Sequence, residues 1–179
     1  KAARPADTLV RISDADARGL DPQMLSDLVS TRIAADQFEG LTRFDGKGEP
    51  EAGLAKDWIV STDGKAWTFQ LRDGLRFSDG VPIAADVFAD ALMRIRDKKS
   101  GSPHASLFAI INSISAANPS TVVVILNYPF PQLPALLAHP AMAALPFHRI
   151  DSAGEKWTAD RPLVTSGPYR LAQWKLNQK

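Results

Sequence analysis

Apolar and polar residues alternate strictly along residues 67–72, which read Trp-Thr-Phe-Gln-Leu-Arg. This period of two is typical of a strand with one buried face and one exposed face. A short apolar stretch at 58–60 precedes it, and the Asp63-Gly64 pair between them favours a hairpin turn. The arrangement recurs over 113–126, with its turn at Asn118-Pro119. The pattern therefore predicts two antiparallel hairpins.

The spacing of apolar residues becomes helical from residue 85 onward. Val87, Ala91 and Ile95 recur at intervals of four residues, which predicts an amphipathic helix over 85–97. Its apolar face would pack against the hairpins, so the chain predicts a mixed α/β fold. The side chains expected to be buried in this core are Trp67, Phe69, Leu71, Val87, Leu92 and Ile95.

Weaker patterns predict the remaining elements. Helices are expected over 23–37, over 104–112 and just before 139–140, and strands over 8–13, 38–44 and 167–174. Glycines and an aspartate at 45–48 predict a turn between two of these elements.

Three Asp-Gly pairs, at 63–64, 73–74 and 79–80, stand where the strand patterns stop. A carboxylate beside a glycine can hold a metal ion or a phosphate, and it can also simply turn the chain. Glycine reaches positive φ at no steric cost, and aspartate hydrogen-bonds the backbone of its own turn. Because both residues already have this structural task, we interpret the pairs as turns.

Composition excludes several classes of function. The 179 residues carry 21 basic and 20 acidic side chains, mixed along the whole length, with a net charge of +1. This balance is not typical of a nucleic-acid-binding protein, so no nucleic-acid partner is expected. Cysteine is absent, which excludes disulfides, thiolate metal sites and a lipidated cysteine within this chain. No apolar run reaches the roughly 20 residues that cross a bilayer.

No catalytic or metal-binding motif emerges from the sequence. Asp14 and Asp16 look like the start of a calcium loop, but Arg18 and Leu25 stand where that loop needs oxygen ligands, so we reject this interpretation. The histidines are too scattered for a zinc signature. A hydrolase would rest only on Ser166 and these histidines. We therefore expect no enzyme, no cofactor and no metal site.

Trp58, Trp157 and Trp174 have two interpretations. They could line a ligand groove, or they could pack in the core or at its rim. Packing is the preferred interpretation, because large aromatic side chains dominate protein cores.

Short blocks of characteristic residues follow one another along the chain. They are Leu20-Asp-Pro22, Phe38-Glu-Gly-Leu41, Gly53-Leu-Ala, Trp58, Asp63-Gly64, Trp67-Thr-Phe, Phe77-Ser-Asp-Gly80, Ser102-Pro103, Thr121-Val, His139-Pro140, Lys156-Trp157 and Ser166-Gly-Pro-Tyr169. In this order the chain resembles the extracytoplasmic solute-binding proteins of peptide ABC importers, the oligopeptide- and dipeptide-binding family. It departs from the family pattern at Ala84, where a threonine normally caps the next helix, and at Val87, where an acid is usual.

The resemblance implies a lobe of the periplasmic-binding-protein type II fold, and an incomplete one. Residues 1–37 would start lobe one, residues 38–145 would form an inserted mixed α/β subdomain, and residues 146–179 would be a partial return to lobe one. Because family members have two lobes joined by a hinge, the chain is expected to be an N-terminal fragment.

The resemblance also implies a function and a set of contacts. The protein would capture short peptides in the periplasm and deliver them to the permease subunits of the importer, as a monomer that is peripheral to the membrane. First-lobe ligand contacts would come from Ser26, Leu28, His104 and His139. Ser26 stands where the family pattern carries an acid, and His104 where it carries an aromatic residue. Other members of the family handle nickel complexes, sugars or opines, and these ligands remain alternatives.

Overall fold

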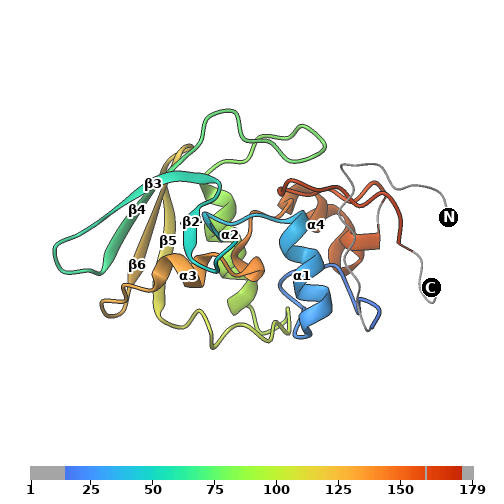
Figure 1. Ribbon diagram of the computed structural model, residues 1–179, viewed down its shortest axis with the longest axis horizontal. Helices are drawn as coiled ribbons and strands as arrows, with labels where there is room; N and C mark the ends of the chain where they lie inside the picture. Colours follow the sequence, from blue (N-terminus) through green and yellow to red (C-terminus); the bar gives the residue numbers. More distant parts are fainter. Residues whose placement is uncertain (1–14, 160, 175–179) are drawn as a thin grey trace.

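The alternating segments pair into one antiparallel sheet of four strands in the computed structural model, which describes residues 15–159 and 161–174 (Figure 1). The order across the sheet is β3, β4, β6 and β5. Their bounds are Ala55–Val60 for β3, Ala66–Leu71 for β4, Ile111–Asn118 for β5 and Thr121–Leu126 for β6. Both predicted hairpins are confirmed, and they join where β4 pairs with β6.

One face of this sheet packs against helix α2 (Asp86–Arg96). Phe69 of β4 lies opposite Val122 of β6, and Trp67 lies opposite Val124, so the strands present one continuous apolar layer to the helix. The predicted core is confirmed for Trp67, Phe69, Leu71, Leu92 and Ile95, which are buried. Val87 is half-buried at the border of the same cluster.

Helix α2 begins without a side-chain cap. Ala85 is its N-cap residue, and neither Ala84 nor Ala85 carries an acceptor for the first free N–H groups. The Asp86 carboxylate instead accepts the N–H of Val87 at 3.0 Å. An acid in the first turn also complements the helix dipole, so Asp86 compensates in part for the missing cap.

The two outer strands of the sheet are irregular. The pairing of β3 with β4 shifts register between Ala55 and Asp57, and the pairing of β5 with β6 shifts between Ile111 and Ser113. Such bulges bend a strand and interrupt its ladder of hydrogen bonds.

The other elements lie beside or beyond this sheet. They are α1 (Leu28–Gln37), β1 (Thr42–Phe44), β2 (Pro50–Ala52), α3 (Leu133–Leu137), the 3₁₀ helix η1 (Pro140–Met142), α4 (Phe147–Ala153) and the 3₁₀ helix η2 (Gly154–Ala159). In Figure 1 the helices α1 and α4 lie at the end of the molecule away from β3 and β4.

Buried apolar side chains form two clusters. The larger surrounds the sheet and α2. The smaller is built from α1, α4, η2 and their flanking loops, and its buried members are Leu20, Leu25, Ala34, Phe38, Ala143, Leu145, Ile150, Trp157 and Leu163. The division into segments 1–37, 38–145 and 146–179 stays a prediction.

Some predicted elements are wrong. The predicted helix 23–37 begins only at Leu28, because Asp27 caps it by accepting the N–H of Ser30 at 2.8 Å. Residues 103–110 form turns instead of a helix, and the guanidinium of Arg96 binds the carbonyls of Phe108, Ile111 and Asn112.

The predicted strands at 38–44 and 167–174 are also corrected. The first shrinks to β1, because Phe38 instead ends α1 and is buried in the smaller cluster. Residues 167–174 form no strand, since the N–H groups of Gly167 and Tyr169 bond to the end of α1, at the carbonyls of Gln37 and Asp36. The predicted strand 8–13 lies outside the described residues.

The Asp-Gly pairs are turns. Gly64, Gly74 and Gly80 all have positive φ, between 69° and 92°. Asp63 accepts the N–H of Lys65 at 3.0 Å, and Asp79 accepts the N–H of Val81 at 3.2 Å. Among the described residues, no group of three or more potential ligand side chains could hold a metal ion.

Asp79 has a second task that the sequence did not indicate. Its other carboxylate oxygen lies 2.8 Å from Nε2 of His148 in α4. The neighbouring Ser78 exchanges hydrogen bonds with Thr165, since each backbone N–H donates to an oxygen of the other residue. The turn at 79–80 therefore connects the segment between β4 and α2 to α4, and through α4 to the smaller cluster.

The contact between the sheet and α2 predicts the cost of shortening Phe69. Phe69→Ala should lower the free energy of unfolding by about 3–5 kcal/mol, because it leaves a cavity in a fully buried layer. Ile59→Ala is the matched control on the same sheet, since Ile59 is 72% exposed, and it should change stability by no more than about 0.5 kcal/mol. Urea unfolding of both variants measures this, and equal losses would contradict the assignment of the core face.

Candidate functional site

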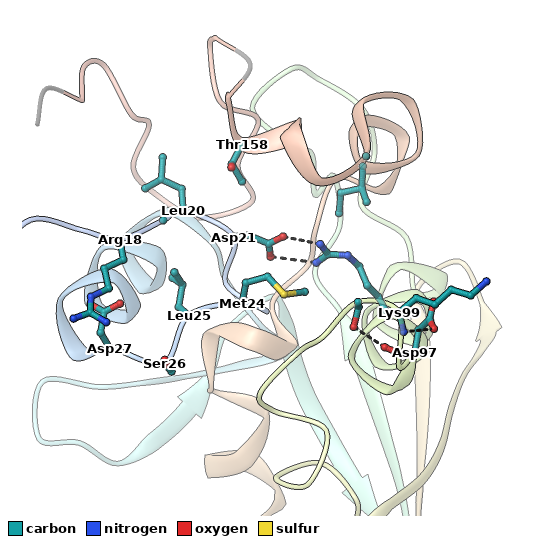
Figure 2. A pocket seen from close by; sticks show the side chains of 15 residues that line it. Arg18, Leu20, Asp21, Met24, Leu25, Ser26, Asp27, Asp97, Lys99 and Thr158 are labelled. Atoms are coloured by element: carbon teal, nitrogen blue, oxygen red, sulfur yellow. Dashed lines mark hydrogen bonds and ion pairs between the residues drawn. The ribbon is translucent and has the colours of Figure 1, made fainter.

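A pocket of about 670 Å³ opens at the border between the two hydrophobic clusters (Figure 2). One wall is the chain from Arg18 to Asp27, another is the end of α2 with the loop that follows it, and the third comes from α4 and η2. The side chains that line it are Arg18, Leu20, Asp21, Met24, Leu25, Ser26, Asp27, Arg94, Asp97, Lys99, Ser100, Ile150 and Thr158. Of the predicted contacts, Ser26 lines this pocket directly.

The segment that carries Ser26, residues 21–27, is here called the Ser26 loop. It is fixed at its start by the carboxylate of Asp21, which accepts hydrogen bonds from both terminal nitrogens of Arg94 at 2.6 and 3.1 Å (Figure 2). The same carboxylate accepts Nε1–H of Trp157 at 2.9 Å. Both charged side chains are largely buried, with exposed fractions of 12% for Asp21 and 16% for Arg94. The loop is thereby joined to α2 and to η2 at one point.

Gln23 provides a second attachment, and it is fully buried. Its Nε2 donates to the carbonyl of Ala91 in α2 at 2.9 Å and to that of Ala141 in η1 at 3.0 Å. Its Oε1 accepts a hydrogen bond from Arg94 at 2.8 Å. Both amide hydrogens are therefore used, and none of the amide is left unpaired. Sequence reasoning missed Gln23, because a single polar residue after an Asp-Pro turn fits no period.

Ser26 itself is exposed and has free backbone groups. Within the described part of the chain, its N–H and C=O make no hydrogen bond. Asp27 follows, and hydrogen bonds from Ser30 lower the pKa of its carboxyl, which keeps it ionised. Arg18 and Lys99 line the same pocket. Ser26 thus offers one donor and one acceptor of the main chain beside charges of both signs.

His104 supports the Ser26 loop from the neighbouring turn region. Its Nε2 lies 2.8 Å from the carbonyl oxygen of Leu25, and because a carbonyl only accepts, this nitrogen carries the proton. Ser102 acts in the same way, as its hydroxyl donates to the carbonyl of Gln23 at 2.7 Å. The loop therefore rests on two side chains from the segment after α2.

His139 lies against His104, with 4.8 Å between the ring centroids. Its Nδ1 accepts the N–H of Ala141 at 3.1 Å and so caps η1. A nitrogen that accepts has no proton, so this contact requires the neutral ring. Burial, and then the charge of His104, lower the pKa of His139 to about 4.

The structure brings three of the four predicted contacts together. Ser26 lines the pocket, while His104 and His139 lie behind the loop that carries it. Leu28 is 63% exposed at the start of α1 and does not line the pocket. That these four residues contact a ligand stays a prediction.

The tryptophans pack. Trp157 is buried in the smaller cluster with its ring 5.8 Å from that of Phe38. Trp58 packs against the larger cluster, and Trp174 against the smaller. The packing interpretation is confirmed for all three.

Comparison with known proteins decides the family. Residues 49–179 match the family model described as "Bacterial extracellular solute-binding proteins, family 5 Middle", which is well over half of the chain. The chain belongs to this family. The resemblance noted from the sequence is therefore confirmed, and so is the assignment of the fold to part of a type II periplasmic-binding-protein lobe.

Individual relatives agree with this assignment. The chain is 32% identical to the periplasmic oligopeptide-binding protein OppA of Salmonella typhimurium, over 96% of this chain and 35% of that protein. It is 33% identical to the "Probable deoxycholate-binding periplasmic protein YgiS" of Escherichia coli, over 92% of this chain and 34% of that one. The crystal structure of Haemophilus influenzae OppA in complex with RPPGFSPFR superimposes with a TM-score of 0.87 at 26% identity, over 92% of this chain and 35% of the other. The chain thus spans about a third of the length of these relatives.

No helix within the described residues is long and apolar enough to cross a membrane. The family members named above are solute-binding proteins.

The Asp21–Arg94 pair predicts a large stability loss when one partner is removed. Arg94→Met should lower the free energy of unfolding by about 3–5 kcal/mol, because it leaves a buried carboxylate with an uncompensated charge. Arg43→Met is the matched control, since Arg43 pairs with Glu51 while 54% exposed, and it should cost less than about 1 kcal/mol. Denaturant unfolding compares them, and a loss below 1 kcal/mol for both would show that the buried pair does not hold the loop.

His139 predicts a pH dependence of stability. Its pKa is lower in the folded chain, about 4, than its ordinary value of 6.5, so the unfolded chain binds the extra proton first as the pH falls. The contribution of neutral His139 to the free energy of unfolding is therefore complete above pH 6.5. It is lost between pH 6.5 and 4, by roughly 2 kcal/mol after allowance for the solvent that still reaches the ring.

Asparagine at this position isolates the effect from the carboxylates that titrate in the same range. In His139→Asn the side-chain oxygen can still cap η1, but nothing titrates. The free energy of unfolding, measured at pH 7, 5.5 and 4.5, should therefore fall less steeply with decreasing pH for His139→Asn than for the natural chain. Identical slopes would mean that His139 is not held neutral.

Proposed function

We propose that the chain forms one wall of a peptide-binding site in the extracytoplasmic receptor of an ABC importer. The observation that carries this proposal is the exposed residue Ser26, whose free backbone N–H and C=O border a pocket in a chain of this family. A receptor that accepts many peptides must recognise what all peptides share, which is the extended backbone. Main-chain hydrogen bonds of this kind give affinity without selecting a side chain.

The pocket has the size that such a role requires. Its volume of about 670 Å³ falls within the roughly 300–1,000 Å³ that is usual for ligand sites. The mixture of Arg18, Lys99, Asp27 and Asp97 in its walls favours a hydrated space in which water adapts to different side chains. We propose that Ser26 and Leu28 make the direct contacts, and that His104 and His139 act from behind the loop.

The remaining parts of the proposal concern the whole protein. The relatives named as periplasmic support a location outside the cytoplasmic membrane, and membership of the family supports delivery to permease subunits. We propose a monomer without membrane-spanning segments and without enzymatic activity. The separate hydrophobic clusters support an inserted subdomain at 38–145 between the two lobe-one segments 1–37 and 146–179.

Binding by this chain alone is expected to be weak. One wall leaves the ligand largely hydrated, while association still costs several kcal/mol in lost freedom. We therefore predict a Kd of about 1 mM or weaker for short peptides, which corresponds to roughly 4 kcal/mol. Titration of the ¹⁵N-labelled chain with trialanine and with RPPGFSPFR measures it. The amide signals of Ser26, Asp27 and Leu28 should move, and those of β4 and β6 should not.

Two substitutions at Ser26 make the titration specific to the backbone. Ser26→Ala keeps the N–H and should bind as the natural chain does, whereas Ser26→Pro removes the donor and should abolish the shifts. Free alanine and deoxycholate are the comparison ligands, and mass spectrometry checks that the peptide is returned intact. Preferential binding of deoxycholate, cleavage of the peptide, or shifts that avoid the Ser26 loop would each overturn the proposal.

A further inference from the structure

Gln23 is a buried residue that does not line the pocket, yet it uses its whole side chain in hydrogen bonds. We propose that Gln23 is a positioning residue for peptide capture, and that its amide sets the place of the Ser26 loop against α2 and η1. This inference rests on the peptide-binding role proposed above and assigns it a residue outside the contact surface.

The chemistry of the position favours this role over simple packing. A buried amide contributes little net stability, because its hydrogen bonds replace those it would make with water. An apolar side chain of similar size would fill the space as well. What the amide adds is direction, since its N–H groups must meet the carbonyls of Ala91 and Ala141 at the same time. A fully satisfied buried network of this kind selects one arrangement of the parts it joins.

The partners of Gln23 belong to different elements. Ala91 lies in α2 and Ala141 in η1, and both residues are fully buried. Arg94 binds Oε1 of Gln23 and also the Asp21 carboxylate, so the side chain and the start of the loop share one guanidinium. The backbone of Gln23 is held as well, because its carbonyl accepts the hydroxyl of Ser102.

The geometry leads from Gln23 directly to the proposed contact. Ser26 follows three residues later, and Leu25 between them is buried and accepts a hydrogen bond from His104. Met24 donates its N–H to the carbonyl of Asp21 in the turn that contains Gln23. A shift of the Gln23 side chain therefore moves the short, tethered segment 23–25. The residue that follows it, Ser26, carries the free N–H and C=O. A loop fixed before the ligand arrives loses less freedom on binding.

Gln23→Met tests the proposal, because methionine matches the shape of glutamine and makes none of its hydrogen bonds. The expected result is a Kd for trialanine at least fivefold weaker than that of the natural chain, with faster hydrogen exchange at the amides of residues 24–28. The strand β4 and β6 amides should keep their protection. Gln70→Met is the matched control, since Gln70 also hydrogen-bonds through both ends of its amide, to Ser120 and Thr121, far from the loop. It should leave the Kd unchanged.

A milder variant guards against loss of folding. Ser102→Ala removes the donor to the Gln23 carbonyl and the weaker acceptor for the N–H of His104, and it should weaken trialanine binding about twofold, with the same local rise in exchange. A purely structural role would lower stability without changing the Kd of the folded fraction. Unchanged affinity in both variants, beside normal binding by the natural chain, would overturn this inference alone. Peptide-induced shifts of the natural chain that avoid the Ser26 loop would overturn the proposed function and this inference together.

Discussion

The carboxylate of Asp21 is the contact on which the arrangement of the molecule depends. It accepts hydrogen bonds from Arg94 of α2 and from Trp157 of η2, and so it joins an element of the larger hydrophobic cluster to one of the smaller. A buried charge is costly unless it is paired and hydrogen-bonded, and here the partners lie 73 and 136 residues further along the chain. Because the Ser26 loop begins at this residue, the constraint that joins the clusters also fixes the proposed binding surface.

Three further residues hold the rest of the site in place. His104 and Ser102 bind the backbone of the loop, and Gln23 holds it through its buried side-chain amide. None of these contacts uses the N–H or C=O of Ser26. A loop with free main-chain groups would normally be mobile, since nothing compensates for its conformational entropy. Here the hydrogen bonds of the neighbouring residues offset this loss of entropy. The free groups can therefore stay in place without bonding to anything within the described chain.

Much of the fold could be predicted from the sequence, because it depends on local periods. The strands around Trp67 and the helix around Leu92 are set by alternation and by four-residue spacing, and the Asp-Gly turns by the chemistry of two residues. The errors arose where distant groups decide. Residues 167–174 lack a strand because they bond to the end of α1, which is far away in the sequence. The partners of Gln23 and Asp21 are likewise distant in sequence, so no periodic pattern marks them, whereas the family blocks did locate Ser26 in the pocket wall.

The irregular outer strands have a consequence for selectivity. A protein proposed to recognise extended backbone also displays extended backbone of its own, and any open sheet edge could pair with a peptide or with another copy of the chain. The register shifts between Ala55 and Asp57 in β3 and between Ile111 and Ser113 in β5 break each edge into short lengths. Lys56, which is exposed, places a charge beside the first of these breaks. An extended peptide that paired there would meet only short lengths of uninterrupted strand.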